Sequence, residues 1–194
     1  MIINEQLEKM RSAAKEGRDP TAADETVLAL ISWANEHQVK RILEIGAGEG
    51  LTSLSLLLNT QAQLTAIELD PVRAQTFRKN IEQFRVENRV RLIEGDAGDV
   101  LPNLQGEYGL IFLDGPKVQY SRYFADCKRL LKAGGALFSD DILLFGWVRG
   151  EAPKKRRMLV EHIREYLKLL EEDPDFQTQI YEYGEGLAVS VKLR

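Results

Sequence analysis

Short apolar segments alternate with segments of helical periodicity through most of this 194-residue sequence. Such alternation is typical of parallel strands joined by helices that cover both faces of a sheet. Strands are predicted at 41–45, 63–69, 89–94, 110–113 and 136–139. Helices are predicted at 3–16, 22–37, 50–59, 72–84, 119–132 and 154–171. The pattern therefore predicts an α/β, Rossmann-like, doubly wound fold.

The C-terminal segment changes to a period of two. Apolar residues alternate over 176–180 and again over 187–193, with Gly184, Glu185 and Gly186 between the two runs. This indicates a β-hairpin, which would complete a mostly parallel, seven-stranded sheet with one antiparallel strand. A chain of this length fits a single domain, with helices in 1–38 and the α/β core in 39–194.

Composition excludes several classes of protein. The formal net charge of −4 gives no overall attraction to nucleic acid, so such a role would need a local basic patch. The single cysteine, Cys127, excludes an intramolecular disulfide and a cysteine-based metal site. The apolar runs are too short to cross a bilayer, and the N-terminus has no basic region followed by an apolar block. We expect a cytoplasmic protein with no membrane partner.

A glycine-rich turn follows the first predicted strand. Residues 41–50 read Arg-Ile-Leu-Glu-Ile-Gly-Ala-Gly-Glu-Gly, which places Glu44 ahead of Gly46, Gly48 and Gly50. Glycines at these positions let the backbone bend sharply and approach a ligand. The dinucleotide pattern G-x-G-x-x-G would need a glycine at Leu51, so a nicotinamide-dependent dehydrogenase is disfavoured relative to nucleoside binding.

Carboxylates stand at the carboxyl ends of the predicted strands: Glu44, Glu68, Asp96, Asp114, Asp140 and Asp141. In an open parallel sheet these ends border the ligand crevice. Glu68 ends the second strand, where an acidic side chain accepts the hydroxyl groups of a ribose. We assign Glu44 and Glu68 to a nucleoside.

The remaining aspartates, Asp114, Asp140 and Asp141, need a positive charge among them. A hard divalent cation with oxygen ligands, Mg²⁺, Mn²⁺ or Ca²⁺, would supply it. Alternatively, Asp140 caps the next segment and Asp114 accepts backbone N–H groups.

Lys117 follows Asp114 by three residues. In a partly dry cleft beside a metal the pKa of this lysine is expected to fall, so that it can act as a base. The alternative is a solvated loop lysine.

Several of these motifs together resemble the class I S-adenosylmethionine-dependent methyltransferases, and within them the divalent-metal O-methyltransferases related to catechol O-methyltransferase. The resemblance extends from about residue 20 to the C-terminus. It rests on five segments, 43–46, 67–71, 94–97, 112–117 and 139–141, which read Leu-Glu-Ile-Gly, Ile-Glu-Leu-Asp-Pro, Glu-Gly-Asp-Ala, Phe-Leu-Asp-Gly-Pro-Lys and Ser-Asp-Asp.

The family assigns a role to each matching residue. Gly46 and its turn would hold the methionine part of S-adenosylmethionine, with Thr52 near its carboxylate, and Glu68 would hold the ribose. Asp96 and Ala97 would border the adenine. The resemblance further implies Asp114, Asp140 and Asp141 as metal ligands, Lys117 as the catalytic base, and a homodimer. The third ligand is usually asparagine in the family, so Asp141 adds a negative charge.

The C-terminal part is similar to a bacterial branch that methylates 5-hydroxyuridine in tRNA. The similarity lies in residues 144–148, 155–157 and 184–190. Four consecutive cations, Lys154, Lys155, Arg156 and Arg157, would bind RNA phosphates in that case; without this similarity, a solvated face is the preferred interpretation. Two alternatives remain open. The acceptor could be a small catechol-like phenol, since both acceptors present two neighbouring oxygens, or the protein could be a nucleoside-binding regulator without turnover.

Overall fold

The computed structural model describes residues 4–17 and 21–194. In this part of the chain, seven strands form one sheet in the order β3-β2-β1-β4-β5-β7-β6. Strand β7 is antiparallel to β5 and to β6, and the other neighbouring pairs are parallel. The predicted doubly wound sheet with a C-terminal hairpin is confirmed. The strands are β1 (Arg41–Ile45), β2 (Gln63–Glu68), β3 (Val90–Glu94), β4 (Tyr108–Leu113), β5 (Leu131–Ser139), β6 (Phe176–Tyr181) and β7 (Leu187–Lys192).

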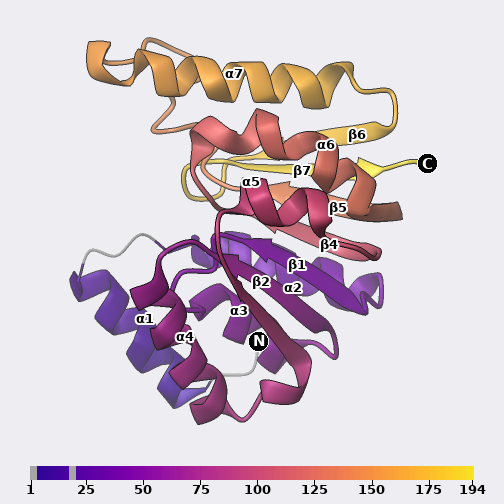
Figure 1. Ribbon diagram of the computed structural model, residues 1–194. Helices are drawn as coiled ribbons and strands as arrows, with labels where there is room; N and C mark the ends of the chain where they lie inside the picture. Colours follow the sequence, from indigo (N-terminus) through magenta and orange to yellow (C-terminus); the bar gives the residue numbers. More distant parts are fainter. Residues whose placement is uncertain (1–3, 18–20) are drawn as a thin grey trace.

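Helices cover both faces of the sheet (Figure 1). One face carries α1 (Glu5–Gly17), α2 (Asp24–Glu36), α3 (Leu51–Asn59) and α4 (Pro71–Phe84). The other carries α5 (Ala97–Val100), α6 (Tyr120–Leu130) and α7 (Arg157–Glu172). Successive residues of a strand point to opposite faces, so in β4 Leu110 packs with the first group of helices and Ile111 with the second. No helix in the described ranges is long and apolar enough to cross a membrane.

Most elements lie within one or two residues of the sequence predictions, and the larger differences are as follows. Helix α6 ends at Leu130, and β5 begins at Leu131, so the glycine-containing segment predicted as a connection belongs to the strand. The predicted helix 154–171 begins as a separate 3₁₀ turn, Lys154–Arg156, before α7. The short helix α5 was not predicted. The first residue of the predicted helix 3–16 lies outside the described residues.

The strand order reverses between β1 and β4, where a ligand crevice is expected. The register pairs Ile45 with Leu113 and Leu113 with Ser139, so β1, β4 and β5 end at the same level. The backbone ladder continues one step further, because Asp114 N–H donates to Ile45 O (2.9 Å) and Asp140 N–H donates to Leu113 O (3.1 Å). The fold therefore brings these two aspartates together beside the glycine-rich turn.

Candidate active site

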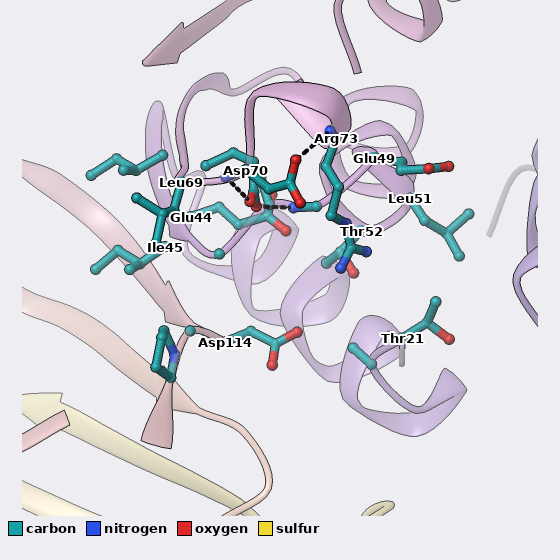
Figure 2. Close-up of a pocket in the computed structure, with 18 of the residues that line it drawn as sticks. Thr21, Glu44, Ile45, Glu49, Leu51, Thr52, Leu69, Asp70, Arg73 and Asp114 are labelled. Carbon is teal, nitrogen blue, oxygen red and sulfur yellow. Dashed lines mark hydrogen bonds between the residues drawn. The ribbon is translucent and has the colours of Figure 1, made fainter. Parts of the chain in front are cut away.

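A cavity of about 1020 Å³ opens at this reversal point (Figure 2). It is large enough for a nucleoside cofactor together with a small acceptor. The predicted site residues that line it are Glu44, Gly46, Gly48, Thr52, Glu68, Asp96, Ala97, Asp114, Lys117, Asp140 and Asp141. Helix α1 covers one side of the cavity through Met10, Ala13 and Ala14, which the sequence analysis did not assign to the site.

The glycines of the turn make room for protein groups. A Cβ on Gly46 would lie 2.4 Å from the carbonyl oxygen of Asp114, and one on Gly50 would lie 2.1 Å from the Phe77 ring. At Gly48 the space is filled by the guanidinium of Arg73. The sequence predicts that glycine is needed here so that the backbone can approach a ligand. The structure shows another reason: the end of β4 and the side chains of α4 lie so close to the turn that a Cβ would clash with them.

Glu68 is buried at the end of β2 and orders the turn. One of its carboxylate oxygens accepts the N–H of Gly48 (2.6 Å), and the other accepts the N–H of Asp70 (2.8 Å). A carboxylate oxygen can accept more than one hydrogen bond, so both oxygens can still receive ribose hydroxyls. Asp96 caps α5 by accepting the N–H of Gly98 (2.7 Å) and lies on the cavity wall with Ala97. Thr52 lies in the first turn of α3.

Glu44 is 1% exposed and accepts a hydrogen bond from the Ser53 hydroxyl on α3. Burial raises the pKa of Glu44, the Ser53 hydrogen bond opposes this, and the charges of Asp114 and Glu68 add to the rise, so that the net pKa is about 8. This carboxyl is therefore largely protonated at neutral pH. Through this hydrogen bond Glu44 joins β1 to α3, the first helix after the turn.

The raised pKa of Glu44 leads to a prediction about stability. Between its ordinary pKa of 4.5 and about 8, the folded protein holds a proton that the unfolded chain releases, so stability falls as pH rises through this range. Replacing Glu44→Gln removes this loss, which amounts to on the order of 5 kcal/mol when complete. Urea unfolding at pH 5 and pH 9 measures it, with Glu36→Gln, at an exposed helix end, as the control. Parallel pH profiles for wild type and Glu44→Gln would contradict the prediction.

Lys117 lies between two of the predicted metal ligands. Its Nζ is 3.0 Å from Asp114 Oδ1 and 2.9 Å from Asp141 Oδ2. An asparagine at position 141 could accept this contact but would not contribute a charge, so Asp141 strengthens the hold on the ammonium. The alternative interpretation of Lys117 as a solvated loop lysine does not hold, because its side chain is only 16% exposed.

The sequence predicts a fall in the pKa of Lys117 beside a metal, whereas here the ammonium itself contacts the two carboxylates and its pKa is raised. Burial lowers its pKa, but the charges of Asp114 and Asp141 and the hydrogen bonds to them outweigh burial, and the net pKa is raised. For the carboxyl of Asp114, by contrast, burial raises the pKa, although the Lys117 ammonium opposes this rise. Lys117 is thus held as an ammonium while both carboxylates contact it.

Asp140 is 3% exposed and has little compensation for its charge. The Thr26 hydroxyl is 3.4 Å from its Oδ1. Burial, followed by the charges of Asp114 and Asp141, raises the pKa of Asp140 to about 7. The backbone of Asp140 is fixed by Tyr120, whose hydroxyl is within hydrogen-bonding distance of Asp140 O (3.2 Å) and Leu113 O (2.9 Å). Tyr120 therefore ties the ends of β4 and β5 together.

The donor set suits a hard divalent cation, because three carboxylates face one ammonium and carboxylate oxygens are preferred ligands of such ions. Within residues 4–17 and 21–194, however, no three Asp, Glu, His or Cys side chains are arranged as ligands of one metal ion. The Lys117 ammonium occupies the position between Asp114 and Asp141. The metal centre therefore stays a prediction that rests on the chemistry of the donors.

The basic run lies outside the cavity. Lys154, Lys155 and Arg156 form the 3₁₀ turn before α7, Arg157 begins that helix, and all four are exposed. The preceding loop, residues 141–150, is fixed to α7 because Arg164 donates hydrogen bonds to the carbonyls of Trp147, Val148 and Gly150. At the tip of this loop Phe145 is 69% exposed, with its ring centroid 5.0 Å from that of Trp147.

Comparison with known proteins gives a consistent result. The family model described as O-methyltransferase matches residues 6–193. The caffeoyl-CoA O-methyltransferase of Populus kitakamiensis is 30% identical over 165 residues, which cover 79% of this chain and 70% of the relative. Two solved structures share the fold.

The Streptomyces achromogenes O-methyltransferase TomG, in complex with S-adenosylmethionine, has a TM-score of 0.87 at 23% identity, and the alignment covers 100% of this chain and 92% of the TomG chain. The Bacillus cereus O-methyltransferase, in complex with S-adenosylhomocysteine, has a TM-score of 0.87 at 20% identity, and the alignment covers 99% of this chain and 92% of the Bacillus cereus chain.

Proposed function

Because the chain belongs to the O-methyltransferase family, we propose that it transfers the methyl group of S-adenosylmethionine to one of two neighbouring oxygens on an acceptor. The observation that carries this proposal is the composition of one cavity. Glu68 borders it at the end of β2, and Lys117 with its aspartates borders it at the ends of β4 and β5. A ribose site and a proton-transfer site thus share one space.

The reaction itself is an in-line displacement. The acceptor oxygen forms a bond to the methyl carbon as the carbon–sulfur bond breaks, and neutral S-adenosylhomocysteine leaves. The protein chiefly aligns the oxygen, the carbon and the sulfur. In this scheme Glu68 fixes the nucleoside through the ribose hydroxyls, and Lys117 takes the hydroxyl proton.

Lys117 can accept a proton only when its two carboxylate partners are engaged elsewhere, because their contact keeps it an ammonium. We propose that Asp114, Asp140 and Asp141 hold a divalent cation, Mg²⁺ or Mn²⁺, in the working enzyme. When bound, such an ion stabilises the negative charge of an acceptor oxygen. The three carboxylates would exchange one ammonium for a stronger positive charge.

For the acceptor, we propose a 5-hydroxyuridine in tRNA, whose O5 lies beside O4. The support is one stretch of the chain, residues 145–157, in which the aromatic pair Phe145 and Trp147 is followed by the four exposed cations of the basic run. Cations that bind phosphates, combined with aromatic rings on which bases stack, are typical of single-stranded RNA recognition. Because one curated relative is named for a coenzyme A thioester, and coenzyme A also carries phosphates, a small phenol carried on such a group is the second candidate.

Neutralising the basic run distinguishes these acceptors. Changing Lys154, Lys155, Arg156 and Arg157 to Gln is expected to raise KM for hydroxyuridine-containing tRNA at least about tenfold and to make its salt dependence shallower. Activity on free catechol should change less than about twofold, because the run lies outside the cavity. Lys79, Arg85 and Lys168, which are exposed cations elsewhere, provide a matched control. Unchanged KM for tRNA, or no methylation of hydroxyuridine-containing tRNA by the wild type, would contradict the RNA acceptor.

A further inference from the structure

Arg73 is a second cation in the cavity, and it belongs to none of the sequence motifs described above. Among the described residues that line the cavity, the positively charged side chains are Arg73 and Lys117. Lys117 lies at the acceptor side, between Asp114 and Asp141. Arg73 comes from the first turn of α4, close after the Asp70 cap, and its side chain runs into the cavity toward the start of α3 and Thr52 (Figure 2).

Gly48 provides the space that Arg73 occupies. A Cβ at this position would lie 2.7 Å from Arg73 Nη2 and 3.2 Å from its Cζ. Any other residue at position 48 would therefore displace the guanidinium from the turn. Gly48 also has a φ of +56°, which disfavours other residues independently. The middle glycine of the turn thus places a positive charge directly beside the backbone that borders the proposed cofactor site.

The amino-acid end of S-adenosylmethionine carries a carboxylate and an ammonium. The charged residues that line the cavity are mostly acids, and their negative charge repels the carboxylate. We propose that Arg73 binds this carboxylate, with Gly48 as the residue that makes room for it. The inference rests on the proposed function and goes beyond it, because it assigns a residue that selects for the intact amino-acid group. Guanidinium and carboxylate form two parallel hydrogen bonds, the strongest common form of this pairing.

The surroundings of Arg73 support this assignment. Arg73 is close enough to Asp114 for its charge to act on that carboxyl. Both residues line the same cavity, so a carboxylate bound by Arg73 would lie in the space that the other site residues border. Thr52, in the first turn of α3, adds a hydroxyl donor on the same side of the cavity. The positive end of the α3 dipole also favours an anion there.

Calorimetry with two ligands tests this assignment. Decarboxylated S-adenosylmethionine keeps the nucleoside, the sulfonium and the amine and lacks only the carboxylate. Wild type is expected to bind S-adenosylmethionine about 10- to 100-fold more tightly than the decarboxylated ligand, the range for a hydrogen bond between charged groups. Arg73→Met should lose most of this preference, because its affinity for S-adenosylmethionine falls while that for the decarboxylated ligand changes less than about threefold. Arg73→Lys should keep part of the preference.

The control is Arg78→Met, on the same helix, whose side chain pairs with Glu94 at the surface and which should leave both affinities unchanged. Equal weakening of both ligands by Arg73→Met, or no change in either, would overturn the assignment while leaving the proposed cofactor in place. Failure of the wild type to bind either ligand would overturn the proposed function and the assignment with it.

Discussion

Replacing Lys117→Met is expected to lower kcat by about 10²- to 10⁴-fold, the usual contribution of a positioned general base. Affinity for S-adenosylhomocysteine should change less than about threefold, because Lys117 faces Asp114 and Asp141 on the acceptor side of the cavity. The loss should therefore appear in kcat rather than in cofactor binding. Single-turnover methyl transfer, together with calorimetry on the same preparation, separates the two quantities.

Lys79→Met, an exposed lysine on α4, is the matched control and should be fully active. A Lys117→Met variant that kept more than a tenth of the wild-type kcat would remove Lys117 from the proton transfer. Removing this lysine also leaves its two carboxylates without their cation, so a thermal melt of the variant is needed to show that the fold persists.

Removing divalent cations is expected to lower the rate of methyl transfer at least about 10²-fold, since a metal contributes several kcal/mol to stabilising a developing oxyanion. Excess Mg²⁺ or Mn²⁺ should restore the rate. The physical reason lies in the uncompensated acids, because Asp140 is buried with its pKa raised to about 7, and Asp114 and Asp141 share one ammonium. The measurement is initial rate against free Mg²⁺ in a chelator buffer, with a catechol as acceptor.

Saturation with respect to free Mg²⁺ would support direct participation of the metal. A rate that is identical with and without chelator would show that Lys117 alone neutralises these carboxylates. In that case the proposed metal site would be withdrawn, and the nucleoside site at Glu68 would be unaffected.

The sheet was predictable because the hydrophobic pattern and the chain topology act together. The continuous apolar run Leu110–Leu113 requires burial on both faces, and parallel strands must end at a common edge. Glu68, Asp114 and Asp140 lie close together because each stands at the end of a strand on that common edge. Their placement could therefore be predicted from the strand ends, which the sequence marks with a change from apolar to acidic residues.

The contacts within the site were not predictable in the same way, because they depend on which side chains meet across helices. The raised pKa of Lys117 arises because Asp114 and Asp141 both contact its ammonium, and the spacing of these residues in the sequence does not show that they meet. Arg73 is separated from Gly48 by 25 residues, and nothing in a single sequence shows that α4 brings its guanidinium to the turn. Tyr120 lies three residues after Lys117, a spacing that could have indicated a shared helical face but not its contact with two strand ends.

Methyl transfer from labelled S-adenosylmethionine by the purified protein tests the central claim most directly. The acceptors are a catechol, hydroxyuridine-containing tRNA and the same tRNA without the hydroxyl, each with saturating Mg²⁺. The account predicts one methyl group on an oxygen of at least one of the first two acceptors, and none on the tRNA that lacks the hydroxyl. Tight binding of S-adenosylmethionine without transfer to either vicinal-oxygen acceptor would contradict it and would favour a nucleoside-binding regulator.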